Sequence, residues 1–503
     1  MTITLAEFPG LAAKKFGDRT ALVIGERKFS FRELDRLSGA LAQNLVKLGV
    51  KPGDRVTLYS PNSWEWIVSY YGALKAGAII NPINVMLTPP EVAYVTRDCA
   101  AKLLIGSREM VAPVVAAGVS GLTNVVFGSG VAEDMIPFDS LLAGPFDFEP
   151  VKVAPNATCT IGYTSGTTGH PKGAMQSHRA VATNVAMTAQ MHLKTDRDVV
   201  VSALPCPHVY GNVVFQAGML CGCTLVLHPR FDAAEILASI ERYKATIFEG
   251  VPTMYMYMLA SPHLEKHQLS SLTRCTVGGQ TMPAAKMQEV EERFGCPLIE
   301  LWGMTELAGA GTTFPFYGER KLGSIGVAMP YCEARIADAK DAAKTMPRGE
   351  VGELMMRGPI VMQGYWANAQ ATHEAIESDG WLHTGDLASM DEDGAIFIVD
   401  RKKDMINSSG FKIFPAEVER VIAAHSGVAL VAVAGVPDPL KGEVAKAYVV
   451  LRPGATEDAD GIITLCRRDL AAYKVPRAVQ FVRDLPKTST GKIMRRRLTD
   501  LNE

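Results

Sequence analysis

The sequence predicts an α/β protein with a large N-terminal α/β domain of several subdomains and a smaller α+β domain at the C-terminus. The chain has 503 residues, more than one compact core usually holds. Up to Asp400, apolar segments typical of strands alternate with amphipathic helical segments, which favours layered sheets with parallel strands. After Asp400 a charged cluster and a polar turn interrupt this alternation, so we expect a second domain there.

An amphipathic helix is the first clear element of the N-terminal part. Ser30 and Glu33 have the spacing of a capping box. Leucines then recur at steps of three and four residues, as on one face of a helix, at positions 34, 37, 41, 45 and 48. The pattern predicts a helix that begins after Ser30.

Strand-like segments follow in alternation with helices. A helix is expected from Trp64 to Lys75, between the first two strands. The expected strands lie at 55–60, 78–80, 102–106, 203–205, 224–228 and 245–248. This order predicts helices layered on sheets.

The last hundred residues have another pattern. The charged segment DRKKD occupies 400–404, and the polar turn SSG follows at 408–410. A helix is expected to begin at Pro415, and a strand is expected at 445–451. These features predict the small α+β domain.

The composition excludes several classes of protein. The 48% hydrophobic and 21% charged residues are typical of a globular chain, and the net charge of −2 gives no basis for a nucleic-acid partner. No basic segment precedes an apolar stretch at the N-terminus, and no apolar run approaches the ~20 residues that span a bilayer. The nine cysteines are scattered without a Cys-x-x-Cys pair. We therefore expect a cytoplasmic protein with reduced thiols and without an integral membrane segment.

One polar segment has the chemistry of a polyphosphate site. It reads YTSGTTGHPKG and occupies 163–173. Hydroxyls, flexible backbone amides and one ammonium group are what the phosphates of a nucleotide need. The spacing does not fit a Walker A loop. Taken alone, the segment is also compatible with a plain polar turn.

This segment resembles the phosphate loop of the adenylate-forming superfamily, which includes acyl-CoA synthetases, peptide-synthetase adenylation domains and firefly luciferase. Further segments match that family in order: PCPHVYG (205–211), GGQT (278–281), WGMTE (302–306), GYW (364–366), WLHTGD (381–386), DRKKD (400–404) and PKTSTGK (486–492). The resemblance covers nearly the whole chain. It implies an ATP-dependent carboxylic acid–CoA ligase, with ATP, Mg²⁺ and coenzyme A as its cofactors and co-substrates.

The resemblance also implies which residues bind ATP. Hydroxyls and amides would hold phosphates, an aromatic ring would stack on the purine, and Asp386 with Arg401 would contact the ribose. The implied residues are Thr164, Ser165, Gly166, Thr167, Thr168, Gly169, Lys172, Gly279, Gln280, Thr281, Trp302, Gly303, Met304, Thr305, Asp386, Arg401 and Lys492. Trp302 stands where much of the family has tyrosine.

The catalytic assignments follow from the same resemblance. Attack of a carboxylate on the α-phosphorus of ATP brings anions together, so cations must offset the repulsion. Lys492, Lys172 and His208 are the expected catalytic residues. Thr164 and Glu306 match the family's Mg²⁺ site. A surface glutamate at a helix start is the alternative for Glu306.

A hinge at Lys403 is implied as well. It would separate an ATP- and acyl-binding domain, 1–402, from a mobile domain, 403–503, that rotates between two half-reactions. Four residues of the mobile domain match CoA-binding positions: Ser409, Gly410, Tyr473 and Lys474. Ser409 replaces a frequent glycine, and Val475 replaces an arginine of certain relatives.

The acyl pocket is the last feature that the resemblance implies. Its residues are His208, Val209, Tyr210, Gly211, Gly250, Val251, Met254, Tyr255, Gly278 and Gly303. Tyr257 occupies the position where malonate-activating relatives carry an arginine, which disfavours a dicarboxylate. The expected partner is a medium-chain, branched or aromatic monocarboxylic acid. The methionines at 254, 256 and 258 are equally compatible with core packing.

Two other functions remain open from the sequence. An acyl-AMP ligase that loads a carrier protein would use the same adenylation residues. A catalytically silent nucleotide-binding homologue is less favoured, because Lys172, Glu306, Asp386, Arg401 and Lys492 are all present. A homodimer is compatible with either function.

Overall fold

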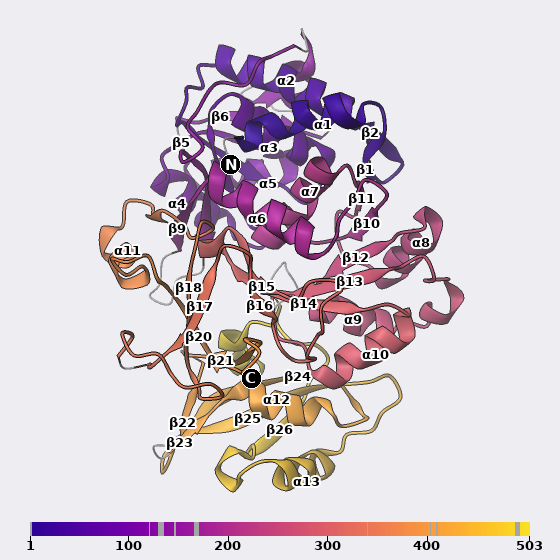
Figure 1. The fold of residues 1–503 in the computed structure, drawn as a ribbon, viewed down its shortest axis with the longest axis vertical. Coiled ribbons are helices and arrows are strands. Elements are labelled where there is room, and N and C mark those ends of the chain that lie inside the picture. Colours follow the sequence, from indigo (N-terminus) through magenta and orange to yellow (C-terminus); the bar gives the residue numbers. More distant parts are fainter. Residues whose placement is uncertain are drawn as a thin grey trace.

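A computed structural model describes residues 3–119, 121–128, 135–144, 147–164, 171–339, 341–402, 404–408, 411–487 and 493–502. Within these ranges the strands form four sheets. Two large sheets and a smaller one make up the N-terminal body, and the fourth sheet belongs to the C-terminal domain (Figure 1). This is the mixed α/β body with a small α+β domain that the sequence predicts.

The first large sheet carries the polar segment of the predicted phosphate site. Its strand order is β19-β9-β8-β4-β3-β5-β6-β7. Its strands are β3 (Arg55–Tyr59), β4 (Ile79–Pro82), β5 (Ala101–Ser107), β6 (Thr123–Phe127), β7 (Ile136–Pro137), β8 (Thr158–Thr164), β9 (Lys172–Ser177) and β19 (Gly364–Tyr365). The pairs from β8 to β7 are parallel, whereas β8 and β9 are antiparallel with Thr164 opposite Lys172.

The second large sheet contributes the predicted adenine segments. Its order is β16-β15-β14-β13-β12-β10-β11-β1-β2, and its central strands are parallel. The strands are β1 (Thr20–Ile24), β2 (Arg27–Ser30), β10 (Val199–Ser202), β11 (Thr224–Leu227), β12 (Ile247–Gly250), β13 (Arg274–Gly278), β14 (Leu298–Met304), β15 (Gly309–Thr313) and β16 (Val327–Ala328). The strands at the two ends of this sheet pair antiparallel, in β1–β2, β14–β15 and β15–β16, and so depart from the parallel arrangement that the alternation favours.

Two smaller sheets, one antiparallel and one mixed, complete the chain. The third has the order β17-β18-β20-β21, and the fourth is built around β24 and β25, with β26 pairing parallel to β25. The strands are β17 (Glu333–Ala337), β18 (Gly352–Arg357), β20 (Leu382–Met390), β21 (Ile396–Arg401), β22 (Ile406–Ser408), β23 (Phe411–Ile413), β24 (Val428–Asp438), β25 (Gly442–Leu451) and β26 (Ala478–Phe481).

Helices cover the sheets as the apolar periodicity predicts. Ser30 accepts a hydrogen bond from the backbone N–H of Glu33 at 3.1 Å and so begins α2. The helices are α1 (Phe8–Phe16), α2 (Phe31–Lys47), α3 (Trp64–Lys75), α4 (Pro89–Asp98), α5 (Arg108–Ala116), α6 (His178–Met191), α7 (Val209–Cys221), α8 (Ala233–Tyr243), α9 (Pro252–Leu259), α10 (Ala284–Phe294), α11 (Ala369–Ala375), α12 (Pro415–Ala423) and α13 (Ala459–Asp469). Among the described residues, no helix has the length and apolar character needed to cross a bilayer.

One predicted strand is wrong. The segment 203–205 is not a strand, because β10 ends at Ser202. Pro205 has no N–H to donate, and the carbonyl of Leu204 accepts a hydrogen bond from the Asn62 amide at 3.0 Å instead of from a neighbouring strand. The chain therefore leaves the sheet here and turns toward α7.

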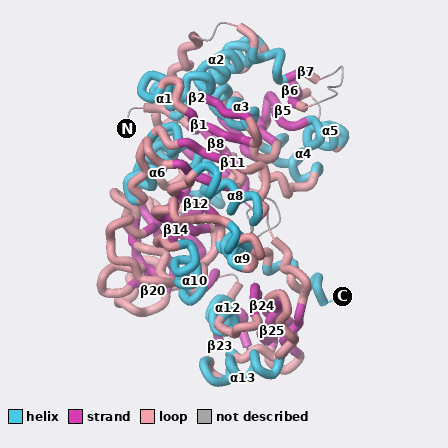
Figure 2. The backbone as a smooth tube through the Cα atoms, turned by 90° about the vertical axis from the view of Figure 1, so that its right-hand side faces the viewer, coloured by secondary structure: helices cyan, strands magenta, loops and turns pink. Residues whose placement is uncertain are grey.

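The two domains have separate cores. Aromatic rings of the large body pack edge to face, with Phe215 at 5.7 Å from Trp66 and 5.3 Å from Tyr70 between ring centroids. In the C-terminal domain, Val418 and Cys466 are among the buried residues of a core of its own. Figure 2 shows this domain as a distinct body beside α9 and α10.

Candidate active site

The predicted phosphate segment connects β8 to β9. Thr164 and Lys172 lie opposite each other at its base, and the Thr164 hydroxyl is 3.4 Å from the Lys172 carbonyl oxygen. The Lys172 ammonium lies 5.3 Å from the ring centroid of Tyr365. The predictions for Ser165, Gly166, Thr167, Thr168 and Gly169 lie outside the described residues.

Glu306 is buried beside this segment rather than solvated. It belongs to a short 3₁₀ turn, Thr305–Leu307, and is 7% exposed. Tyr365 donates its hydroxyl to the Glu306 carboxylate at 2.8 Å. Burial raises the pKa of Glu306, and the Tyr365 hydrogen bond opposes that rise. The surface alternative for Glu306 is therefore wrong.

Glycine at position 162 allows the close approach of this turn to β8. A Cβ on Gly162 would lie 2.7 Å from Cγ2 of Thr305. On the neighbouring strand, the Gln176 amide donates to the Thr305 carbonyl at 2.8 Å. These contacts hold Glu306 next to the base of the phosphate segment.

The donor set fits a magnesium ion that is bound chiefly through substrate phosphates. Among the described residues, no three His, Cys, Asp or Glu side chains cluster as an all-protein metal site. Glu306 provides one carboxylate, and Thr164 provides a hydroxyl at the start of the phosphate segment. Mg²⁺ is commonly bound by one or two carboxylates together with phosphate oxygens and water.

The predicted purine and ribose residues converge from three strands. Trp302, near the end of β14, donates its indole N–H to Asp386 at 2.8 Å. The other carboxylate oxygen of Asp386, on β20, lies 3.4 Å from Nε of Arg401 at the end of β21. The structure thus brings these three residues together, although up to 99 positions separate them in the sequence.

The remaining ATP-site predictions lie around this group. Gly279, Gln280 and Thr281 follow the end of β13, and Gly279 has a φ of +91°. Gly303 and Met304 end β14, next to Thr305. A Cβ on Gly303 would lie 2.0 Å from the Gly309 carbonyl oxygen, so only glycine fits where β14 meets β15.

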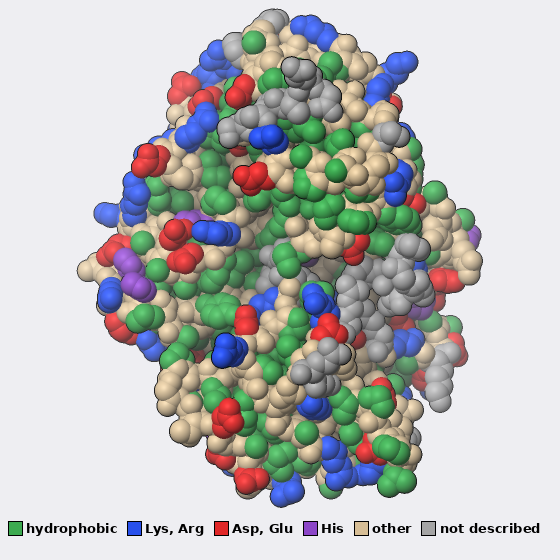
Figure 3. Space-filling view, turned by 180° about the vertical axis from the view of Figure 1, so that it is seen from behind, with side chains coloured by type: hydrophobic (Ala, Val, Ile, Leu, Met, Phe, Trp, Pro, Cys, Tyr) green, Lys and Arg blue, Asp and Glu red, His purple; other side chains and the backbone are tan. Residues whose placement is uncertain are grey.

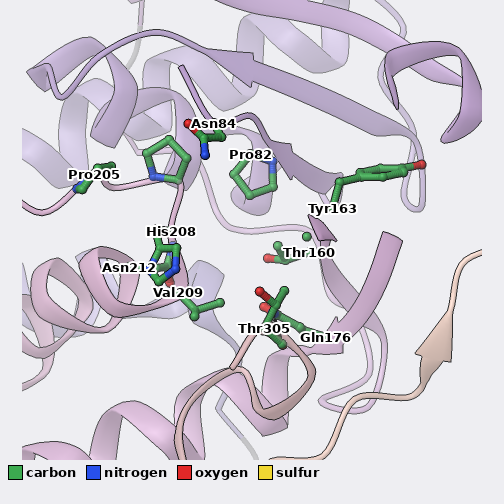
Figure 4. Close-up of a pocket in the computed structure, with 12 residues that line it drawn as sticks. Pro82, Asn84, Thr160, Tyr163, Gln176, Pro205, His208, Val209, Asn212 and Thr305 are labelled. Carbon is green, nitrogen blue, oxygen red and sulfur yellow. Dashed lines mark hydrogen bonds between the residues drawn. The ribbon is translucent and has the colours of Figure 1, made fainter. Parts of the chain in front are cut away.

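A cavity joins the predicted acyl and phosphate regions. His208 and Val209, at the start of α7, face Thr305 and Gln176 across it, whereas the ring of Tyr163 points away (Figure 4). The lining residues are Pro82, Asn84, Thr160, Gly162, Tyr163, Gln176, Pro205, Pro207, His208, Val209, Asn212 and Thr305. His208 also accepts a hydrogen bond from the Tyr210 backbone N–H at 3.3 Å and caps α7.

Apart from His208 and Val209, the predicted acyl residues are not among those that line this cavity. Tyr210 shares a 2.6 Å hydrogen bond with Thr276, and Tyr255 donates to the Thr276 carbonyl at 2.7 Å. Met254 is buried on the same helix as Tyr255. Four further residues of this group are also buried: Gly211, Gly250, Val251 and Gly278.

Sequence reasoning missed several lining residues. Thr160, Gln176 and Asn212 are buried polar side chains on β8, β9 and α7. A polar residue within an apolar strand or helix could have indicated them, because a buried polar side chain needs a hydrogen-bond partner. Tyr365 was also missed as the partner of Glu306, although it lies within the GYW motif.

The C-terminal assignments are described only in part. Lys492, Lys403, Ser409 and Gly410 lie outside the described residues. Tyr473 stacks on Phe411 with ring centroids 4.9 Å apart. Both oxygens of Glu417 accept hydrogen bonds from the Lys474 ammonium at 2.7 Å.

The chain is similar to known proteins over nearly its whole length. Residues 11–366 match the AMP-binding enzyme family, and residues 417–492 match the AMP-binding enzyme C-terminal domain. Feruloyl-CoA synthase of Amycolatopsis sp is 37% identical over 494 residues, which cover 98% of this chain and 97% of that protein. Long-chain-fatty-acid–CoA ligase of Bacillus subtilis is 34% identical over 522 residues, which cover 97% of this chain and 93% of that protein.

A solved structure agrees with these matches. The anthranilate CoA ligase AuaEII, in complex with anthranoyl-AMP, superposes with a TM-score of 0.94 at 30% identity, covering 99% of this chain and 97% of that one. The similarity extends over both domains. The chain therefore belongs to the AMP-binding enzyme superfamily, in its acyl-CoA ligase branch, and is an AMP-forming acid–CoA ligase that works through an acyl-adenylate.

Proposed function

We propose that the chain activates a hydrophobic monocarboxylic acid, of medium length, branched or aromatic, and transfers its acyl group to coenzyme A. The composition of the cavity carries this proposal. Among the described residues that line it, none is lysine, arginine, aspartate or glutamate, and three prolines and Val209 supply apolar surface beside polar side chains such as Asn212 and Thr305. A second carboxylate would lack a cation to offset its desolvation. The names of two relatives, which specify feruloyl and anthranilate substrates, support an aromatic acid, and the name of the long-chain-fatty-acid–CoA ligase supports a hydrophobic one.

Adenylation joins a carboxylate oxygen of the acid to the α-phosphorus of ATP and releases pyrophosphate. Lys172 would neutralise charge on the β- and γ-phosphates, and Lys492 would act near the α-phosphate. Glu306 and Thr164 would hold Mg²⁺, which neutralises phosphate charge when bound. His208, on the cavity wall, would orient the acid.

Thioester formation joins the CoA sulfur to the acyl carbon and breaks the acyl–phosphate bond, which releases AMP and the thiol proton. Ser409, Gly410, Tyr473 and Lys474 are the proposed CoA contacts. The proposed domain boundary is Lys403, with 1–402 on one side and 403–503 on the other.

Figure 3 shows basic and acidic side chains interspersed over the face it views, without a basic patch suited to nucleic acid.

Pyrophosphate exchange across a panel of acids, repeated with CoA present, tests the proposal. We expect the highest kcat/KM for aromatic, branched or medium-chain monoacids, and release of AMP and thioester when CoA is added. Malonate or acetate as the best substrate would contradict the acid class. Adenylate without thioester would favour a carrier-protein acceptor.

The Lys492→Ala variant tests the division of roles. It is expected to abolish pyrophosphate exchange and to spare thioester formation from supplied acyl-adenylate. Equal loss of both steps would contradict the role of Lys492.

A further inference from the structure

Helix α9 has two faces that serve different parts of the molecule. Met254, Tyr255 and Met258 are buried in the large domain. Met256 packs both against the core of the large domain and against a cluster of C-terminal-domain residues that includes Leu430 and Leu485. Tyr257 follows on this outer side and is 39% exposed. Residues two apart on a helix point in nearly opposite directions, so Tyr255 and Tyr257 have different environments.

The Tyr257 hydroxyl is bound by the C-terminal domain. It donates to the Asp484 carboxylate at 3.1 Å and accepts from the Lys487 ammonium at 2.6 Å. The same ammonium forms an ion pair with Asp484 and lies 5.1 Å from the centroid of the Tyr257 ring. The Tyr257 hydroxyl therefore both donates to and accepts from the Asp484–Lys487 ion pair of the other domain.

A second contact anchors the same part of the C-terminal domain. The backbone N–H of Ile493 donates to the side-chain oxygen of Gln280 at 3.2 Å. Lys487 and Ile493 form an antiparallel bridge, and Met494 N–H donates to the Pro486 carbonyl at 2.8 Å. The two bridged positions are thus each tied to the large domain, one through α9 and one through the predicted adenine segment.

We propose that Tyr257 is a positioning residue for adenylation, not a contact of the acid. Its hydroxyl fixes Lys487, while Gln280 fixes Ile493, the residue that follows Lys492 in the sequence. The inference rests on the proposed function in one respect, the role of Lys492 in the first half-reaction. It gives a physical reason for a tyrosine at 257: a phenol can accept from an ammonium and donate to a carboxylate at once, whereas phenylalanine can do neither.

The experiment measures both half-reactions with the full-length Tyr257→Phe variant. The substitution removes hydrogen bonds to two charged groups, and such bonds contribute enough free energy that we expect kcat for pyrophosphate exchange to fall roughly ten- to a hundredfold. The KM for the acid and the rate of thioester formation from supplied acyl-adenylate and CoA should not change. A purely structural defect would lower both half-reactions together.

Matched variants make the test specific. Tyr331→Phe removes a hydroxyl from a tyrosine that is 86% exposed, and exchange should be unaffected. Asp484→Asn should reduce exchange, and combining it with Tyr257→Phe should cost less than the product of the two separate losses. Equal loss of both half-reactions, unchanged exchange, or a raised acid KM at constant kcat in Tyr257→Phe would each overturn the proposal.

Failure of the proposed function is distinguishable from failure of this inference. If Lys492→Ala retained exchange, the role of Lys492 would be wrong whatever Tyr257 does. If Lys492→Ala abolished pyrophosphate exchange and Tyr257→Phe left it unchanged, only the positioning role of Tyr257 would be wrong.

Discussion

The indole N–H of Trp302 donates to the carboxylate of Asp386 at 2.8 Å, so the predicted purine-stacking ring and the predicted ribose ligand are joined directly. Much of the family has tyrosine where this chain has tryptophan. Arg401 holds the other oxygen of the same carboxylate. The three residues of the predicted nucleotide site are therefore already joined to one another without ATP.

Replacing Trp302 by phenylalanine keeps an aromatic ring but removes the donor to Asp386. Because a hydrogen bond to a charged group is lost, we expect the KM for ATP to rise roughly tenfold, with little change in the KM for the acid. Steady-state pyrophosphate exchange at varied ATP measures both constants. An unchanged KM for ATP would mean that the bond does not orient Asp386 for binding.

Replacing Tyr365 by phenylalanine removes the hydroxyl that donates to buried Glu306. The ionised carboxylate loses a partner, so the pKa of Glu306 should rise further above its ordinary value. Mg²⁺ needs the ionised form, so the acid limb of the pH–rate profile for exchange should move to higher pH. Tyr163→Phe is the control, because the Tyr163 hydroxyl bonds Asp98 instead of Glu306. A profile shifted equally by both substitutions would contradict the prediction.

Glu300 should make stability depend on pH. It is buried on β14, and burial raises its pKa to about 8 from an ordinary value of 4.5. The folded state therefore retains a proton that the unfolded chain releases, and stability should fall as pH rises between these two values. The slope is at most roughly 1.4 kcal/mol per pH unit.

Glu300→Gln cannot ionise, so it should lose this contribution to the pH dependence. Denaturant unfolding of both proteins at several pH values should give a stability difference that increasingly favours the variant up to about pH 8. Parallel pH dependences would show that Glu300 ionises normally.

Lys194 and Glu249 form a buried ion pair at 2.7 Å, with each side chain 1% exposed. Lys194→Met should destabilise the protein by about 3–5 kcal/mol, because Glu249 would remain buried without its cation. The double variant with Glu249→Gln should recover much of this loss. Thermal and denaturant unfolding measure the effect.

An exposed ion pair is the control for this prediction. Lys321 contacts Asp391 and Asp393 at 2.6 Å but is 35% exposed. Lys321→Met should therefore cost no more than about 1 kcal/mol. Losses of similar size for Lys194→Met and Lys321→Met would show that burial does not govern the contribution of the Lys194–Glu249 pair.

Local patterns predicted most elements of the fold. The helix after Ser30, the helix from Trp64 to Lys75 and the helix at Pro415 all occur, because capping and apolar periodicity act within a few residues. The prediction of a strand at 203–205 was wrong because the Leu204 carbonyl accepts its hydrogen bond from the side chain of Asn62, a residue 142 positions away.

The candidate site was predicted unevenly for the same reason. The resemblance of the ordered motifs to the family predicted Glu306, Asp386 and Arg401 as site residues, and their side-chain chemistry suits the predicted roles. That Tyr365 holds Glu306, or that Gln176 braces Thr305, depends on which strands lie side by side.

By itself the sequence predicted the α/β fold and the second domain, because periodicity and turn residues act over a few positions. The activation of an acid by ATP followed from the resemblance of its ordered motifs to the adenylate-forming superfamily. The tertiary structure alone decided that Glu306 is buried, that the cavity has no described cationic lining, and that Tyr257 is bound by Asp484 and Lys487. These properties arise where distant segments pack against one another. Burial, and with it the cost of an unpaired charge, is set only by that packing.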